Sequence, residues 1–186
     1  LYGNVTLLYR PVILVHDLGG LPQDFDSNGY SSFLTGENFN PKFIRYFDFG
    51  SDASGYKSFT DLRGLSQKFS DDLTALSVDY IKEGGNGKVD VVAFGLGNLV
   101  VKDHLSKNKS QNKVRSFISV GAPNKGSWLV DMDRNKDNFN PGSSKFNSIV
   151  ASLFLPDLKK MNVISSGRDS SLFPSFLDQG RSDSSI

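Results

Sequence analysis

Apolar residues along this chain fall into short runs that are rich in β-branched and aromatic side chains and end at glycine, proline or polar turn residues. Runs of this length and composition, bounded by turn signals, are typical of strands buried in a sheet. The run at 12–16 ends in Asp17-Leu18-Gly19-Gly20, for example. The predicted strands are residues 5–8, 12–16, 43–49, 89–94, 114–120 and 162–165.

A different period marks the segments between these runs. Over residues 61–83, apolar residues recur at steps of three and four, which predicts one amphipathic helix that ends at Gly84-Gly85. The apolar stripe of this helix consists of Leu62, Leu65, Phe69, Leu73, Leu76 and Tyr80. Two further helices are predicted at about 96–106 and at 145–155, and Pro156 stops the second of them.

The alternation of strands and helices predicts an α/β fold with a mostly parallel central sheet and helices on both faces. Residues 1–186 are expected to form a single domain, because a chain of 186 residues with 38% hydrophobic residues can bury one core of ordinary size. Ligands of such sheets bind at the carboxyl ends of the strands. His16, Gly95 and Gly121 are therefore expected along that edge.

Charge and cysteine content exclude several classes of function. The 21 Lys and Arg residues nearly balance the 20 Asp and Glu residues, and no long basic run is present, so nucleic acid is not an expected partner. The absence of cysteine excludes a disulfide framework and thiolate metal sites. No apolar run approaches the ~18 residues of a membrane span. No cofactor or metal is expected, because Asp131, Asp133 and Asp137 lack the glycine and closing glutamate of an EF-hand calcium loop.

Two polar stretches are the expected contact surfaces. Residues 21–41 are predicted to be a long irregular connection or one short helix, and residues 128–144 a polar loop rich in Asn and Asp. Long connections usually carry function or partners. A protein partner or self-assembly is therefore expected to use the loops 21–39 and 128–146.

The stretch VDVVAFGLGNLV (89–100) predicts a strand, a sharp turn and a helix, which is the frame of the nucleophile elbow G-x-S-x-G. Gly95 stands where that motif has serine. The same glycines also match the start of the dinucleotide motif G-x-G-x-x-G, but Val100 stands in place of its third glycine. A dinucleotide site is therefore disfavoured.

Four stretches in order resemble the lipase and esterase branch of the α/β-hydrolase superfamily. PVILVHDLGG (11–20) is similar to the strand and oxyanion loop of that family, and VDVVAFGLGNLVV (89–101) is similar to its elbow. SVGAPNKGS (119–127) resembles the strand and loop that follow, and LPDLKKMN (155–162) a segment before the strand that leads to the acid. The resemblance covers nearly the whole chain and implies an α/β-hydrolase-like fold.

The resemblance also implies where each catalytic group would lie. The nucleophile position is Gly95, which has no side chain, and the oxyanion amides match Leu18 and Leu96. Asp17 replaces a glycine of the oxyanion loop and places a carboxylate near the site where negative charge would develop. Asp183 matches the triad acid and Asp169 is the alternative, although both also fit solvated turn aspartates.

The two histidines do not supply the expected base. His16 matches a family histidine that supports the oxyanion loop, and His104 lies in the helix beyond the elbow, which predicts a surface or packing role. The family's catalytic histidine follows the acid near the end of the domain. We therefore expect that this C-terminal part either lies beyond these residues or has been lost from the fold.

The sequence thus predicts a catalytically inactive lipase-like domain that is retained as a binding or structural module. The alternative is a fragment of a carboxylic-ester hydrolase whose catalytic histidine lies outside the 186 residues. The resemblance implies a lipid or an ester as the ligand, and its secreted members favour an extracellular location.

Overall fold

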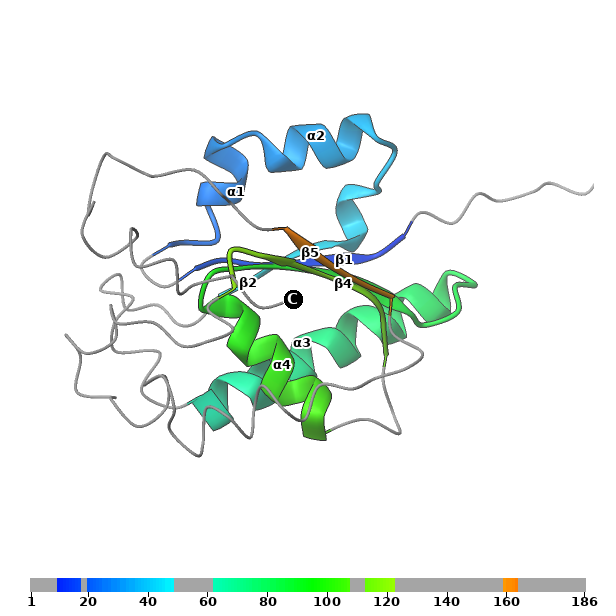
Figure 1. Ribbon diagram of the computed structural model, residues 1–186. Coiled ribbons are helices and arrows are strands. Elements are labelled where there is room, and N and C mark those ends of the chain that lie inside the picture. Colours follow the sequence, from blue (N-terminus) through cyan, green and yellow to red (C-terminus); the bar gives the residue numbers. More distant parts are fainter. Residues whose placement is uncertain (1–9, 18–19, 49–61, 108–112, 123–158, 164–186) are drawn as a thin grey trace, which may run out of the picture.

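A parallel sheet of five strands lies at the centre of the molecule, in the order β2-β1-β3-β4-β5. The computed structural model describes residues 10–17, 20–48, 62–107, 113–122 and 159–163. Figure 1 shows this sheet between two layers of helices. Its strands are β1 (Val12–Val15), β2 (Ile44–Phe47), β3 (Val89–Phe94), β4 (Val114–Val120) and β5 (Lys159–Val163).

Helices cover both faces of the sheet. The short helices α1 (Asp24–Ser27) and α2 (Tyr30–Gly36) lie on one face, and α3 (Leu62–Lys82) and α4 (Gly97–Lys107) lie on the other (Figure 1). A 3-10 turn, η1 (Pro41–Phe43), leads into β2. The predicted α/β class, with a parallel sheet and helices on both faces, is confirmed.

Alternate residues of the strands supply two separate cores, because successive side chains of a strand point to opposite faces. Ile13 and Val15 of β1 belong to the large core beneath α3 and α4. Val12 and Leu14 instead pack with Phe25 beneath α1 and α2. The apolar stripe of α3 is buried in the large core as its spacing predicts, through Leu65, Phe69, Leu73, Leu76 and Tyr80.

Most predicted strands differ from the observed ones only at their ends. The bounds of β3 and β4 are those predicted, whereas β1 ends at Val15 and β2 begins at Ile44. The prediction of a strand at 162–165 is wrong in its bounds, because β5 begins at Lys159, where it pairs with Ser116 of β4. The predicted strand at 5–8 and helix at 145–155 lie outside the described residues.

The segment 21–41 is more ordered than the sequence predicts. It forms α1, α2 and η1 instead of an irregular connection or one short helix. Asp24 accepts the backbone N–H of Leu21 at 2.7 Å, and Gly29, with φ of 78°, separates the two helices. Neither helix has enough residues for a periodic apolar pattern to stand out, and for that reason the prediction missed them.

The order of the strands reverses between β1 and β3. From β1 the chain moves outward to β2, and from β3 it moves in the other direction to β4 and β5. In open parallel sheets the crevice at the carboxyl ends of two such strands is where ligands bind. His16 and Asp17 follow β1 and Gly95 follows β3, so these residues lie at the reversal point.

Candidate functional site

The turn between β3 and α4 has the backbone conformation of a sharp elbow. Gly95 has φ of 47°, in the left-handed region that glycine occupies without steric cost. Its N–H donates to the carbonyl of Val120 in β4 at 2.9 Å, which fixes the turn to the neighbouring strand. The sharp turn that the sequence predicts between the strand and the helix is confirmed.

Asn98, in the first turn of α4, stabilises this elbow through its side chain. Its side chain is fully buried, and Nδ2 donates to the carbonyl of Gly95 at 2.8 Å and to that of Val120 at 3.1 Å. Its backbone N–H also donates to the Gly95 carbonyl, at 3.2 Å. One side chain therefore joins the turn, the helix and β4.

Asn98→Ala is expected to lower the free energy of unfolding by about 1.5 kcal/mol, because two buried hydrogen bonds are lost while each carbonyl keeps a backbone donor. Urea denaturation followed by circular dichroism measures the loss. Asn86→Ala is the matched control, since Asn86 is exposed and its side chain makes a single hydrogen bond, to the N–H of Lys88. Equal losses in the two variants would contradict the role given to Asn98.

The carboxylate of Asp17 fills the space above Gly95. Oδ1 of Asp17 accepts the backbone N–H of Leu96 at 2.6 Å. A Cβ atom added to Gly95 would lie 2.0 Å from Cγ, Oδ1 and Oδ2 of Asp17. The Asp17 carboxylate thus lies where a side chain of residue 95 would be, and it accepts the hydrogen bond of the Leu96 amide.

Gly97 lets α4 begin against the end of β1. A Cβ at this position would lie 2.3 Å from the carbonyl oxygen of His16 and 2.9 Å from a methyl group of Val15. No other residue has room for this approach. The second glycine of the turn is therefore required by the packing of helix on strand.

Solved structures of a phospholipase and a lipase are similar to this chain in overall fold. Phospholipase PlaB from Legionella pneumophila is 14% identical over 90% of this chain and 41% of its own, with a TM-score of 0.64. The mature form of the Bacillus licheniformis lipase BlEst2 is 18% identical over 95% of this chain and 73% of its own, with a TM-score of 0.65. This chain has the α/β-hydrolase fold.

At these identities the likeness establishes the fold alone. No protein-family model matches the sequence, and no curated protein matches it in sequence. The chain spans less than half the length of PlaB and about three quarters of that of mature BlEst2. The fold accounts for the position of the turn between β3 and α4, and the chemistry of the site depends on this chain's own residues.

His16 lies next to the elbow of the hydrolase fold and is bound to the loop backbone. Its side chain is buried, and Nδ1 lies 2.7 Å from the carbonyl oxygen of Asp17. Burial lowers the pKa of His16, and this hydrogen bond and the carboxylates of Asp48, Asp24 and Asp17 offset only part of that effect. A neutral ring that donates from Nδ1 supports the loop, which is the role that the resemblance implies.

His104 belongs to the packing between α3 and α4. It is 4% exposed, and its ring meets the ring of Phe69 edge to face at 5.3 Å. Burial lowers its pKa to about 4, helped by Lys113 and Lys107 and opposed by Asp103. Of the two predicted roles, surface or packing, the structure shows packing.

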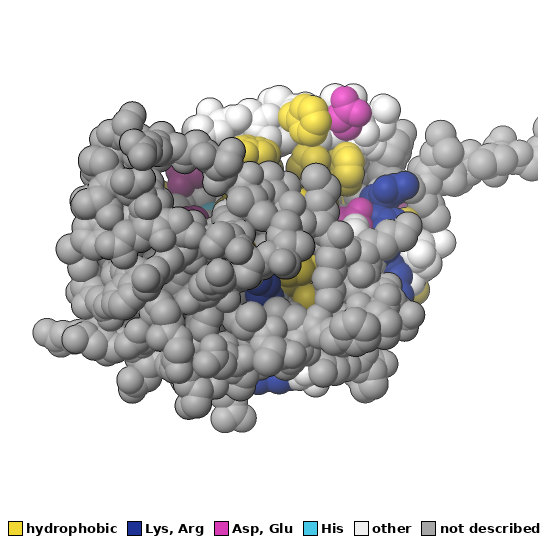
Figure 2. Space-filling model, in the orientation of Figure 1, with side chains coloured by type: hydrophobic (Ala, Val, Ile, Leu, Met, Phe, Trp, Pro, Cys, Tyr) yellow, Lys and Arg dark blue, Asp and Glu magenta, His cyan; other side chains and the backbone are white. Residues whose placement is uncertain are grey.

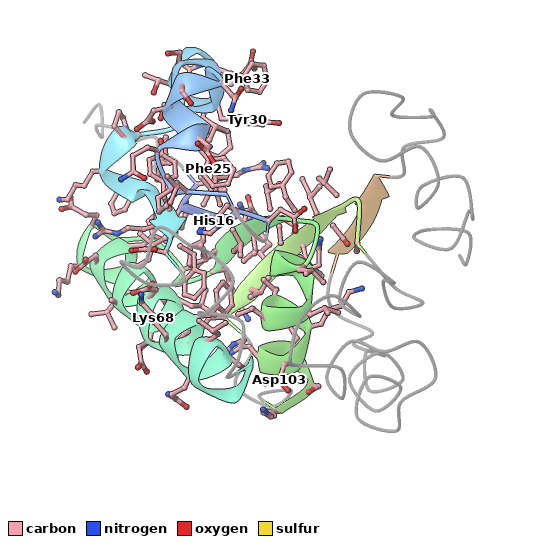
Figure 3. The ribbon with its side chains drawn as sticks, turned by 90° about the vertical axis from the view of Figure 1, so that its left-hand side faces the viewer. His16, Phe25, Tyr30, Phe33, Lys68 and Asp103 are labelled. Carbon is pink, nitrogen blue, oxygen red and sulfur yellow. The ribbon has the colours of Figure 1, made fainter. Side chains whose placement is uncertain are left out.

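Aromatic side chains form a layer over the elbow that the sequence did not reveal. Phe94, the residue before Gly95, packs against Phe25 and Tyr30 at ring distances of 5.6 and 5.7 Å. In Figure 3, His16 lies at the sheet edge below Phe25, Tyr30 and Phe33. Figure 2 shows hydrophobic side chains at the surface over α2. In this part of the chain, Leu21, Tyr30 and Phe33 are exposed.

The predicted site residues fall into two groups. Leu18, Asp169, Asp183 and the loop 128–146 lie outside the described residues, whereas Gly95 and Leu96 meet at the elbow. Within the described part of the chain, no group of three or more acidic, histidine or cysteine side chains is arranged to hold a metal. Among the described helices, none is both long and apolar enough to cross a membrane.

Proposed function

We propose that this chain is a catalytically inactive lipase-like domain of the α/β-hydrolase fold, retained as a binding or structural module. One observation carries the proposal. At the elbow, where ester hydrolysis needs an oxygen nucleophile, Gly95 offers no side chain, and the Asp17 carboxylate fills the space.

The electrostatics of the elbow also oppose acyl transfer. An oxyanion hole works by aiming backbone N–H groups at the oxygen on which negative charge develops. Here the N–H of Leu96 already donates to a carboxylate. A second negative charge at that place would be repelled by Asp17, and residue 95 has no side-chain oxygen that could attack an ester.

The ligand class we propose is a lipid or an ester. The support for it is the likeness to a phospholipase and a lipase, together with exposed apolar side chains in the segment that covers Phe94. Tyr30 packs against Phe94, and Leu21 and Phe33 are exposed in the same segment. A module of this kind would bind such a ligand without cleaving it.

The proposal is tested by exposing the chain to a fluorophosphonate probe and to short-chain nitrophenyl esters. We expect neither labelling nor turnover above a heat-denatured sample, with an active lipase as the positive control. Labelling or turnover in the native sample alone would overturn the proposal. Light scattering after size exclusion tests a structural role, and a monomer at high concentration would count against self-assembly.

A second function is an ester hydrolase whose remaining catalytic groups lie beyond these residues. The observation that favours it is partial coverage, since the chain spans only 41% of PlaB. In that case a longer protein that contains this chain would hydrolyse nitrophenyl esters, and its labelled residue would identify a nucleophile other than residue 95. An inactive longer protein would leave the binding module as the function.

A further inference from the structure

We propose that Asp17 and Gly95 form an interlocked pair, in which the Asp17 carboxylate takes both the place of a nucleophile and the oxyanion amide of Leu96. The chain thereby closes its own acyl site from within. This inference deepens the proposed function and rests on it for the view that the site does not turn over esters. It makes Asp17 a positioning residue of the elbow.

Asp17 and residue 95 compete for the same space. All three atoms of the Asp17 carboxyl group would lie 2.0 Å from a Cβ on residue 95. Non-bonded heavy atoms rest at about 3.5 Å, so the two groups would occupy the same space. Any residue except glycine at position 95 would therefore have to push the carboxylate away from the Leu96 amide.

Asp17 is also held electrostatically at the Leu96 amide. Leu96 precedes the first residue of α4, so its N–H belongs to the positive end of that helix. A carboxylate that accepts such an N–H makes a charge-assisted hydrogen bond, here at 2.6 Å. The anion that a substrate would form during acyl transfer is thus replaced by an anion of the protein itself.

Because Asp17 occupies both places, an open elbow requires two substitutions. Gly95→Ser alone would place an oxygen nucleophile into the volume of the Asp17 carboxylate, and Asp17→Gly alone would free the amide without supplying a nucleophile. Only both changes together recreate the arrangement of an open elbow. The loss of the nucleophile and the presence of Asp17 are therefore coupled in this chain.

A double-mutant cycle on stability measures this coupling without any substrate. Gly95→Ala is made in the native chain and in the Asp17→Gly variant, and the unfolding equilibrium constant is measured by urea denaturation. Gly121→Ala is the matched control, because Gly121 has a similar φ of 56° but no atom of the described residues within 4 Å of an added Cβ. It reports the cost of the left-handed conformation alone.

We expect Gly121→Ala to raise the unfolding constant about tenfold and Gly95→Ala to raise it about a hundredfold in the native chain. In the Asp17→Gly background, Gly95→Ala should cost no more than the control. Asp17→Asn keeps the size of the side chain and should keep the large cost. An equal cost of Gly95→Ala in the native and Asp17→Gly backgrounds would overturn the proposal.

A second readout follows the amide of Leu96 by NMR. In Asp17→Gly its N–H should move upfield and exchange with solvent about tenfold faster, because its acceptor is gone. Asp24→Asn, which removes a carboxylate on the same edge, should leave the Leu96 signal unchanged. If Gly95→Ala fails to fold, rescue by Asp17→Gly supports the pair, and an unchanged Leu96 amide in Asp17→Gly refutes it.

These readouts are independent of activity. Ester turnover by the native chain would refute the inactive module. The coupling between Asp17 and residue 95 would still be decided by the double-mutant cycle. Absence of coupling would refute the interlocked pair. The proposal of an inactive module would then rest on the absence of a side chain at Gly95 alone.

Discussion

Gly97→Ala is expected to lower the free energy of unfolding by about 3 kcal/mol, although the same change in most helices is stabilising. Gly97 is the first residue of α4, and an added methyl group would lie 2.3 Å from the carbonyl oxygen of His16. This neighbour is backbone of the strand edge and cannot rotate away. The helix would have to move off β1, and urea denaturation would record the loss.

Gly36→Ala provides the matched control for this prediction. Gly36 is the last residue of α2, and within the part of the chain that the structure describes no atom lies within 4 Å of an added Cβ. We expect this variant to be as stable as the native chain or more stable by about 0.5 kcal/mol. If Gly97→Ala behaved in the same way, the close packing of α4 on β1 would be wrong.

Acidification from pH 6.5 to pH 4 is expected to destabilise the fold by about 3 kcal/mol through His104 alone. Burial lowers the pKa of His104 from 6.5 to about 4, so the folded chain keeps the ring neutral over this range. The unfolded chain takes up the proton below pH 6.5. The stabilisation is therefore complete above pH 6.5 and is lost as the pH falls to about 4.

His104→Leu separates this effect from other titrating groups. Burial lowers the pKa of His16, so His16 also destabilises the fold on acidification. Burial raises the pKa of Asp72, so Asp72 has the opposite effect on stability. The unfolding free energy of the native chain minus that of His104→Leu should therefore fall by about 3 kcal/mol between pH 7 and pH 4. A constant difference across that range would contradict the assignment.

The sequence predicted the fold well where apolar runs end at glycine. Residues 89–94 and 114–120 are buried strands that meet Gly95 and Gly121, and their bounds are those observed. The predicted strand at 162–165 begins after the observed start of β5, because Lys159 and Lys160 interrupt the apolar pattern. The start of β5 is set by its pairing with β4. Pairing between distant segments is not visible in a local pattern.

The sequence indicates part of the elbow's geometry. The sharp turn at Gly95 follows from the strand, glycine and helix pattern of residues 89–100. That the Asp17 carboxylate lies in the volume of residue 95 could not be predicted, because it depends on how closely β1 and α4 approach across 79 residues of chain. The two hydrogen bonds from Asn98 Nδ2, one of them to β4, depend on the same packing.

The hydrogen bond between Asp17 and Leu96 changes what the elbow contributes to the protein. Enzymes commonly give up stability at the active site, because polar groups kept ready for a substrate remain unsatisfied in its absence. In this chain the amide of Leu96 is satisfied by a carboxylate of the protein itself. The hydrogen bond joins the loop after β1 to the start of α4, so the elbow contributes to the stability of the fold.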